Sequence, residues 1–554
     1  VFSVYKNRGK KGVIQFCKDL RSSLYTYLSK VDNHQLGAKI ESLHPSLRFL
    51  KRYPDNESLL RVLRLVTSIL SLSRGIHLTP EIKLDSIEDV SIRSLKLSSL
   101  GIHVSDFWYE LGYKARNRPV RTPRSLIWSK YHMTTHSGPN GHGLFSACSD
   151  LLSLTEDMIE QIHIIAGDQL YMNMRTLLKG LDSFQLKSFF NAKEGLTRKL
   201  TPIPSPEGKT RVVAILDYWS QTALRPLHRY LFKVLKKIPQ DCTFDQGSFV
   251  TKLPQSDFYD SVDLTAATDR FPIKVISLVL KPLLGCKYVD AWENLMVKYP
   301  FKIARVDREI YYKAGNPMGA YSSWASFAVA HHYVLYYCCR EINISWRGSP
   351  YVILGDDIVI AHEGLSKKYR EVIKDLGIEI SERKSHTSKH FLEFAKRAIW
   401  NGSEITPFPI SAICLTRKSP SLMASVMLNE CGRGWNFRDE IPELLSDLWG
   451  YQKLPRSLIR SRKILITTSF HIMEVLRGRK TAEEAFKPLL VKFFPDMVSS
   501  IRNFSPGVYD AWISTCTLSM FTTSFNQGTE RINKVLRDVG DTENHPKDEL
   551  GALS

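Results

Sequence analysis

Two neighbouring aspartates stand between apolar runs in residues 351–361, Tyr-Val-Ile-Leu-Gly-Asp-Asp-Ile-Val-Ile-Ala. The β-branched residues on either side predict two short buried strands, and Gly355 predicts a tight turn between them. Such a hairpin places Asp356 and Asp357 at its tip. Adjacent carboxylates repel each other unless a cation lies beside them, and hard oxygen ligands at a rigid turn suit Mg²⁺ or Mn²⁺. An ordinary turn with a spare acid is the alternative at this point.

A second acidic segment lies upstream, in residues 258–271. A short strand is expected to end at Asp263, and the small residues that follow predict a bend that folds Asp269 back toward the strand end. Asp269 could equally cap a helix N-terminus. When Asp263 is paired with Asp356 its interpretation becomes sharper, because aspartates from two strand ends can bridge two metal ions roughly 3.5–4 Å apart.

Two cations enter a further predicted strand at Lys209 and Arg211. Residues two apart on a strand point to the same face, so this pair could clamp a triphosphate. A solvated strand edge is the alternative. The Gly-Lys-Thr triplet at 208–210 hints at a P-loop, but that motif requires its first glycine where Ile203 stands, so a P-loop is excluded.

Arginines are concentrated between residues 114 and 124, where Pro119 and Pro123 exclude a continuous helix. An extended arginine-rich strip could grip a phosphate backbone, and the aromatic residues Trp128 and Tyr131 could stack a base. A solvated basic loop is the alternative. The arginines of this strip are Arg116, Arg118, Arg121 and Arg124.

A loop rich in glycine and serine, residues 315–323, precedes an apolar helix expected at 324–339. Glycines in such a loop allow the backbone to approach a ligand closely, and Ser322 or Ser323 can cap the helix. The helix carries His331 and His332, which we interpret as histidines with partners inside the protein rather than as metal ligands.

The composition describes a globular protein with a polyanionic partner. The chain has 554 residues, 43% hydrophobic and 11% aromatic, and a formal net charge of +20. A surplus of positive charge on this scale favours nucleic acid as the partner, and a basic surface that only keeps the protein soluble is the alternative. The nine cysteines are scattered without a CxxC pair, which argues against structural zinc and against a disulfide framework. No apolar run reaches transmembrane length, because the longest, at 324–339, is interrupted by its two histidines.

Six motifs, in order along residues 130–410, resemble the palm motifs of viral RNA-dependent RNA polymerases and are most similar to those of mitoviruses, within the narnavirus-like group. Any one of them is weak, whereas six in order are specific. A departure is His136-Ser137, where a lysine is expected nearby, so the role of that loop stays open. The motifs are Gly138-Pro-Asn-Gly141, Glu207-Gly-Lys-Thr-Arg211, Asp263-Leu-Thr-Ala-Ala-Thr-Asp269, Gly315-Asn-Pro-Met-Gly-Ala-Tyr-Ser-Ser-Trp324, Ile353-Leu-Gly-Asp-Asp-Ile-Val-Ile360 and Phe394-Ala-Lys-Arg397.

The resemblance implies an α+β right-hand polymerase with fingers, palm and thumb. An antiparallel palm sheet would be flanked by helices, and the fingers and thumb would be rich in helices. The implied divisions are an N-terminal extension and fingers at 1–255, palm at 256–274, a fingers insertion at 275–314, palm again at 315–400, thumb at 401–530 and a polar C-terminal tail at 531–554.

The resemblance also implies nucleotidyl transfer assisted by two Mg²⁺ ions, for which Mn²⁺ can substitute. Asp263, Asp356 and Asp357 would be the metal ligands. One ion would lower the pKa of the attacking hydroxyl, and the other would neutralise the departing pyrophosphate. Lys384 would serve as a general acid toward pyrophosphate, with a plain surface lysine as an equal alternative.

The substrate contacts that the resemblance implies involve NTPs and RNA. Lys209 and Arg211 would hold the triphosphate, and Asp269 with Ser322 or Ser323 would read the ribose 2′-hydroxyl and so favour NTPs over dNTPs. Template and product RNA would contact the four arginines of the strip, together with Gly315, Lys396 and Arg397.

Replication of a positive-strand RNA genome in the host mitochondrion follows from the same resemblance. A reverse transcriptase shares the palm and the two metals, but its usual pair before the aspartates begins with an aromatic residue, whereas Leu354-Gly355 stands here. In addition, the polar Asp269 occupies the place of a bulky gate that would exclude ribose. The other alternative is a catalytically decayed genomic copy that only binds RNA, against which the intact acidic motifs argue.

Overall fold

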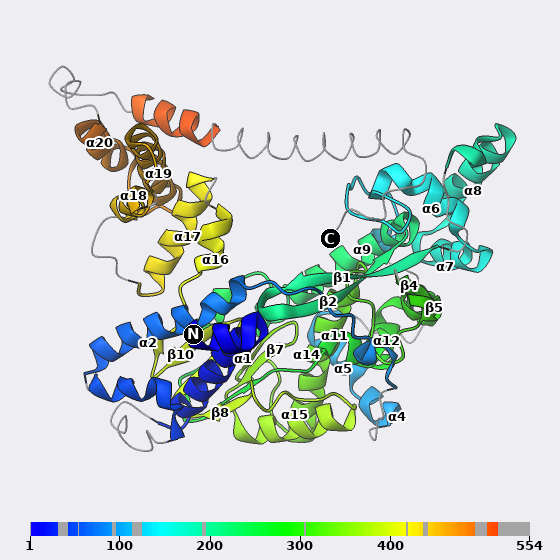
Figure 1. Cartoon of the computed structure of the whole chain (residues 1–554). Coiled ribbons are helices and arrows are strands. Elements are labelled where there is room, and N and C mark those ends of the chain that lie inside the picture. The colour runs from blue at the N-terminus through cyan, green and yellow to red at the C-terminus, as the bar shows by residue number, and fades with distance from the viewer. Residues whose placement is uncertain are drawn as a thin grey trace. The chain divides into compact units, whose positions relative to one another are not determined.

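The chain divides into two compact units, Val1–Pro407 and Phe408–Ser554 (Figure 1). Both helices and antiparallel strands build the first unit, so the fold class is α+β. No helix in the described ranges combines the length and the hydropathy needed to cross a membrane. The computed structural model describes residues 2–31, 42–53, 55–90, 96–113, 124–190, 196–303, 306–416, 419–435, 441–451, 453–493 and 507–518.

The central sheet of the first unit has four strands in the order β6-β7-β3-β8. Its members are β6 (Tyr351–Leu354), β7 (Asp357–Ile360), β3 (Tyr259–Val262) and β8 (His386–Ser388), and each neighbouring pair is antiparallel. The predicted hairpin at 351–361 and the predicted strand before Asp263 are therefore confirmed. They lie side by side, which the sequence did not show.

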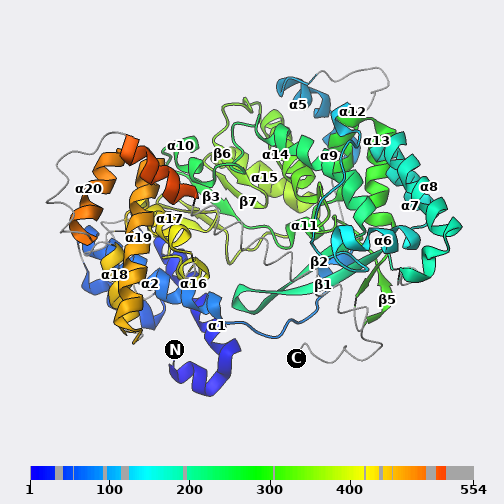
Figure 2. The same cartoon turned by 90° about the horizontal axis from the view of Figure 1, so that it is seen from above.

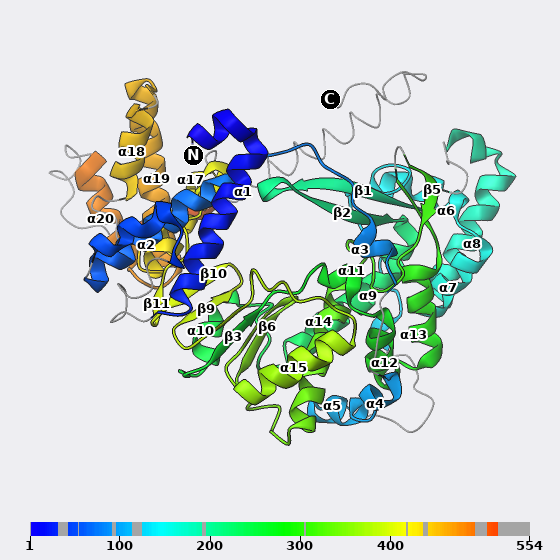
Figure 3. The ribbon, with the colours of Figure 1, turned by 60° about the horizontal axis from the view of Figure 1, so that its bottom comes forward.

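Both faces of the β6–β7 hairpin are buried, which explains why β6 and the residues of β7 after Asp357 are continuously apolar. Ile353 and Ile358 pack into the large core that also contains α14 (Ser323–Glu341) and α15 (Glu363–Asp375). The alternate residues Val352 and Val359 pack on the other face, against Phe394 and its neighbours. Figure 3 shows α14 and α15 lying along the sheet. The apolar helix expected at 324–339 is thus confirmed as a core element.

A long hairpin carries the two predicted cations. It consists of β1 (Arg198–Ser205) and β2 (Lys209–Leu216), which pair antiparallel over their whole length. The hairpin joins a second sheet in the order β2-β1-β4-β5, with β4 (Phe301–Ile303) and β5 (Val306–Ile310). Figure 2 shows several helices gathered around its base. These are α7 (Glu156–Ala166), α8 (Asp168–Ser183), α9 (Tyr218–Leu235), α12 (Ile273–Leu284) and α13 (Cys286–Glu293).

The N-terminal helices α1 (Phe2–Leu28) and α2 (Asn56–Ser71) pack on a third sheet, β11-β10-β9. That sheet comprises β9 (Phe391–Phe394), β10 (Arg397–Trp400) and β11 (Ser403–Glu404). Leu24 and Leu63 share a buried cluster with Phe391 and Trp400. These N-terminal helices therefore support the sheet that contains β9.

The regular elements described in the second unit are all helices. Its helices are α16 (Ile410–Thr416), α17 (Pro420–Gly432), α18 (Ile441–Tyr451), α19 (Arg456–Leu476) and α20 (Ala482–Phe493), together with residues 507–518. Met423, Met427 and Ile466 form its small core. The tail expected at 531–554 lies outside the described residues.

Candidate active site

The paired aspartates lie at a two-residue turn between β6 and β7. Leu354 pairs with Asp357, which leaves Gly355 and Asp356 as the central residues of the turn. Gly355 has φ +65°, a value that suits glycine at the first central position of a type II′ turn. A Cβ atom on this glycine would lie 2.7 Å from Nε1 of Trp324, so the indole packs directly against the turn.

Asp263 lies beside this turn because β3 and β7 are adjacent. The register pairs Val262 with Ile358, and the next position along the two strands places Asp263 opposite Asp357. The carboxylate of Asp263 accepts a hydrogen bond from the Lys384 ammonium, and its backbone N–H donates to Ser385 Oγ at 3.2 Å. The structure therefore brings both acidic motifs and the predicted Lys384 to one end of the central sheet.

Four carboxylates influence one another here. Burial, followed by the negative charges of Asp356 and Asp263, raises the pKa of Asp357 to about 7. Desolvation by the surrounding protein also raises the pKa of Asp356, and the charge of Asp263 adds to that effect, whereas Arg211 and Lys384 oppose it. The fourth carboxylate is Glu393 on β9, whose pKa is raised by its burial. Sequence reasoning missed Glu393, because no spacing links it to the other three.

The two cations of β2 interact electrostatically with these acids. The charge of Arg211 partly offsets the rise in the pKa of Asp356, and Lys209 interacts electrostatically with Asp263. Both positive charges therefore lie near the site. Desolvation and the positive charges of Lys384 and Lys18 hold the pKa of Lys209 below its ordinary value. An anion between these cations would relieve their mutual repulsion, so the cluster is suited to bind a phosphate group.

A buried histidine holds the turn from behind. Nδ1 of His331 lies 2.8 Å from the carbonyl oxygen of Gly355, and Nε2 lies 2.7 Å from the hydroxyl of Tyr369. A carbonyl can only accept, so Nδ1 carries the proton and Nε2 accepts from the tyrosine. Burial lowers the pKa of His331 to about 4, which keeps this neutral form. The interpretation of His331 as a histidine with internal partners is confirmed, but its link to the turn required the structure.

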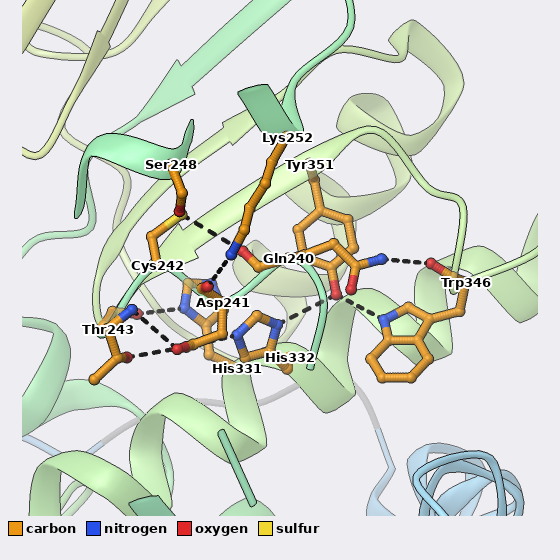
Figure 4. Close-up of polar contacts among 11 residues, drawn as sticks. Gln240, Asp241, Cys242, Thr243, Ser248, Lys252, His331, His332, Trp346 and Tyr351 are labelled. Atoms are coloured by element: carbon orange, nitrogen blue, oxygen red, sulfur yellow. Dashed lines mark hydrogen bonds and ion pairs between the residues drawn. The ribbon is translucent and has the colours of Figure 1, made fainter. Parts of the chain in front are cut away.

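A polar network underlies the start of β6 (Figure 4). His332 contacts Asp241 through Nε2 and the Tyr351 hydroxyl through Nδ1, each at 3.2 Å. Trp346 Nε1 donates to the same hydroxyl at 2.6 Å, and Thr243 donates to Asp241 through both its N–H and its hydroxyl. Neighbouring histidines of α14 therefore fix β6 at two places, the turn and the opposite end.

The bend after β3 and the glycine loop are joined through their backbones. The N–H groups of Gly315 and Asn316 donate to the carbonyls of Asp269 and Thr268 at 2.9 and 3.1 Å. A Cβ on Gly315 would lie 2.3 Å from the Thr268 oxygen, so this close approach already requires glycine there. The proposed RNA contact at Gly315 stays a prediction.

Asp269 lies in the short helix α11 (Ala267–Arg270). Burial raises its pKa to about 6, and its Oδ2 accepts from Ser86 at 2.9 Å. Its Oδ1 is buried and has no hydrogen-bond partner among the described residues. A buried oxygen without a partner is costly, so an external donor such as a hydroxyl would be favourable at this position.

The two serines before α14 are engaged within the protein. Ser322, at φ +69°, is the N-cap residue, but its hydroxyl makes no cap bond and instead accepts from Trp292 Nε1 at 2.9 Å. Ser323 donates to the side-chain oxygen of Asn316. The expected side-chain cap is wrong, because closer partners hold both hydroxyls. Through these bonds the two serines nevertheless hold the loop 315–323, which packs beside Asp269.

The residues predicted to contact RNA differ in whether they are exposed, paired within the protein or outside the described residues. Lys396 is exposed in the β9–β10 turn, at φ +64°, and its positive charge partly offsets the rise in the pKa of Asp357. Arg397 forks onto the Glu404 carboxylate at 2.9 and 2.7 Å and lies over the Phe249 ring. RNA binding through Arg397 would have to replace that ion pair. Three residues of the arginine strip, Arg116, Arg118 and Arg121, lie outside the described residues, and so does the side chain of Arg124.

A divalent cation requires several oxygen donors that converge on one point. Within the described ranges, no group of three or more His, Cys, Asp or Glu side chains is arranged as a ready metal site. Three carboxylates nevertheless converge on one end of the sheet, those of Asp263, Asp356 and Asp357. Their charges repel one another, and the Asp263 carboxylate is paired with the Lys384 ammonium. Oxygen donors whose repulsion a cation would relieve fit Mg²⁺ or Mn²⁺.

Several known proteins are similar to this chain. A model of the mitovirus RNA-dependent RNA polymerase family matches residues 125–502. The RNA-directed RNA polymerase of Cryphonectria parasitica mitovirus 1 is 36% identical over 279 residues, which are 47% of this chain and 34% of that protein. The match therefore spans about a third of the viral relative.

Two further similarities were found. An uncharacterized mitochondrial protein of Arabidopsis thaliana is 33% identical over 156 residues, covering 27% of this chain and 76% of that protein. Among solved structures, the elongation-state RNA-dependent RNA polymerase of BmCPV overlaps with a TM-score of 0.35 at 11% identity, over 70% of this chain and 38% of that chain. The site described above follows from the pairing of β3, β6 and β7 in this chain and does not depend on the similarity to that structure.

Proposed function

Because the chain belongs to the mitovirus RNA-dependent RNA polymerase family, we propose that it transfers nucleotidyl groups from NTPs onto an RNA strand as a template directs. The observation that carries this proposal is the meeting of Asp263, Asp356 and Asp357 on adjacent strands, opposite the cations of β2. Carboxylates and cations that face each other serve phosphoryl chemistry, because the reacting phosphates need positive charge on every side.

The right-hand divisions fit this function. The central sheet with its aspartates would be the palm, made of 256–274 and 315–400. Residues 1–255 and the insertion 275–314 would supply the N-terminal extension and the fingers, and the helices of 401–530 the thumb. The end of the first compact unit at Pro407 supports a division near the start of the proposed thumb.

Asp263, Asp356 and Asp357 would hold the divalent ions. When bound, two Mg²⁺ ions, or Mn²⁺ in their place, lower the pKa of the attacking hydroxyl and neutralise the charge of the leaving pyrophosphate. The protein's part is to keep the three carboxylates together at the rigid turn that His331 and Trp324 hold.

The cations of the site would bind the triphosphate of the NTP, and one of them would donate a proton to the leaving pyrophosphate. Lys209 and Arg211 would hold the triphosphate and stabilise the charge that develops on it. Lys384 contacts Asp263 and is half exposed, so it can turn toward a bound nucleotide and donate a proton to pyrophosphate.

Selection of ribose would rest on Asp269. Its partnerless Oδ1 is suited to accept a hydrogen bond from the 2′-hydroxyl. Ser322 and Ser323 would act by holding the loop beside Asp269 through their bonds to Trp292 and Asn316.

Template and product RNA are the proposed macromolecular partners, and a net charge of +20 suits them. The host mitochondrion is the proposed location. It is supported by the mitoviral relative and by the similar protein that is named mitochondrial.

Incorporation of labelled NTP on a primed RNA template tests this function. Asp356→Asn should lower incorporation at least about 1,000-fold, because several kcal/mol of transition-state stabilisation are lost with a metal ligand. RNA binding should survive, since the turn carries no net positive charge to lose. Asp257→Asn, an exposed aspartate two residues before β3, is the matched control and should keep wild-type incorporation.

The same assay separates the alternatives. Wild-type protein that prefers dNTPs would be a reverse transcriptase, and wild-type protein that binds RNA but incorporates neither NTPs nor dNTPs would only be an RNA-binding protein. Extension by Asp356→Asn at a rate comparable to wild type would show that the assignment of the aspartates is wrong.

A further inference from the structure

The tip of the β1–β2 hairpin is anchored to helix α1. Arg21 donates through Nη2 to both carboxylate oxygens of Glu207, at 2.8 and 3.0 Å. Ser73 Oγ donates to Glu207 Oε1 at 2.8 Å, and Lys18 Nζ donates to the Glu207 carbonyl at 3.1 Å. Three groups from the N-terminal region therefore converge on one residue of the turn that precedes Lys209.

This contact is buried and charged. The side chain of Arg21 is 15% exposed and that of Glu207 is 9% exposed. Burial alone would raise the pKa of Glu207, but Arg21 and the hydrogen bond from Ser73 outweigh it and hold the pKa below its ordinary value. A carboxylate kept ionised in a buried place has a strong preference for the partner that stabilises it.

The turn itself adopts a conformation that requires support. Glu207 has φ +60° and ψ +36°, which is the left-handed region and is unfavourable for a residue with a side chain. Gly208 follows at φ +67°, and a Cβ there would lie 2.5 Å from Leu78 Cδ1. Glu81 N–H also donates to Thr210 Oγ1 at 3.0 Å. Residues 73–81 thus surround the tip from which Lys209 and Arg211 emerge.

The same turn of α1 reaches the other cation of the site. Ser22, next to Arg21, donates through Oγ to the Arg383 carbonyl at 3.3 Å, one residue before Lys384. The positive charge of Lys384 contributes to the lowered pKa of Lys209, and both ammonium groups interact with Asp263. One helix turn therefore contacts both segments that bring cations to Asp263. Figure 3 shows the hairpin extending toward α1 above the central sheet.

We propose that Arg21 is a positioning residue which, through Glu207, fixes Lys209 and Arg211 where they bind the NTP triphosphate. The N-terminal helices are then part of the nucleotide site, although they do not touch the substrate. This inference rests on the proposed polymerase function. Without the ion pair, the strained turn would relax, and the two cations would spend less time facing the aspartates.

Hydrogen exchange and kinetics on the full chain test the proposal together. In Arg21→Ala, amides of residues 203–211 should exchange at least about tenfold faster, while amides of β6 and β7 exchange as in wild type. The KM for NTP should rise about tenfold with kcat within about threefold, because the lost contact serves binding. Arg21→Lys, which keeps the charge but not the guanidinium group that reaches both carboxylate oxygens, should fall between Arg21→Ala and wild type.

The matched control is Arg61→Ala, which removes an exposed Arg–Glu pair within α2 and should change neither measurement. Glu207→Gln breaks the pair from the other side and serves if Arg21→Ala does not fold. Wild-type exchange at 203–211 in a folded variant overturns the anchor, and a wild-type KM overturns its role in NTP binding. Wild-type protein that incorporates no NTP overturns the polymerase function and the NTP role, while the exchange result still decides whether the anchor exists.

Discussion

The carboxyl group of Asp357 shows how strongly the site is strained by its own charge. Its pKa is raised to about 7 by burial and by Asp356 and Asp263. A protein that needed only a turn would not gather these acids, because each one raises the cost of ionising the next. The sequence revealed the three aspartates by their spacing within motifs. It did not reveal Glu393, whose place depends on how β9 packs.

The first prediction concerns the stability of Asp357→Asn. The folded protein binds the Asp357 proton more tightly than the unfolded chain does, so wild-type stability falls as pH rises from 3.8 toward about 7. Metal-free Asp357→Asn should therefore be more stable than wild type at about pH 8, by on the order of 2 kcal/mol, since water screens part of the charge. The difference should shrink as the pH is lowered toward 3.8. Thermal unfolding in the presence of a chelator measures it.

The exposed control Asp257→Asn should show no such gain at either pH. An Asp357→Asn protein that is less stable than wild type at high pH would mean that the ionised carboxylate is well compensated in the free protein. The charge cluster would then give no reason for a cation to bind.

At the scale of elements, strand and helix identities could be predicted from sequence, but their neighbours could not. The apolar runs around Gly355 and the segment before Asp263 each predicted a strand. Their pairing, which places Asp263 opposite Asp357, depends on a contact between positions about a hundred residues apart. The helix cap expected at Ser322 failed for the same kind of reason, because Trp292 offers its hydroxyl a nearer partner.

The second prediction tests the β6–β7 turn. Gly355→Ala places a Cβ against the Trp324 indole at φ +65°, so it should both destabilise the fold and displace Asp356. Gly402→Ala is the matched control, since φ is +74° there and nothing lies within 4 Å of the added carbon. The control should lose only about 1–2 kcal/mol for the left-handed backbone and should keep its activity. Chemical denaturation and NTP incorporation together measure both effects.

If Gly355→Ala and Gly402→Ala lost equal stability and Gly355→Ala kept wild-type incorporation, the contact with Trp324 would not position the turn. The support attributed to α14 would then reduce to the His331 hydrogen bond.

At the scale of the whole molecule, the site is assembled from segments that span most of the first unit. Helix α1 near the N-terminus, the β1–β2 hairpin, the central sheet and β9 all contribute to it. In α1 the apolar residues Ile14, Cys17, Leu20, Leu24 and Leu28 recur every three or four positions, and this periodicity is typical of a helix that buries one face. It could not predict the partner of that face, because periodicity carries no information about what a helix packs against.

The net charge of +20 predicted a polyanionic partner for the chain as a whole, and the family supports RNA as that partner. Charge alone did not indicate where RNA would lie. Of the proposed contacts, Lys396 is exposed near the aspartates, while Arg397 is paired with Glu404. Composition thus identified the kind of partner, and only the fold separates a cation that is free to bind from one that holds the protein together.

Direct binding of Mn²⁺ tests the central claim, that aspartates from β3 and the β6–β7 turn form one divalent-cation site. Titration of the purified full chain, followed by electron paramagnetic resonance, measures the affinity without any need for turnover. We expect wild type and Asp257→Asn to bind Mn²⁺ alike, and Asp263→Asn and Asp356→Asn each to lose at least about tenfold in affinity, because each removes a charged oxygen ligand. Binding of Mn²⁺ by both of these variants with wild-type affinity would contradict the account.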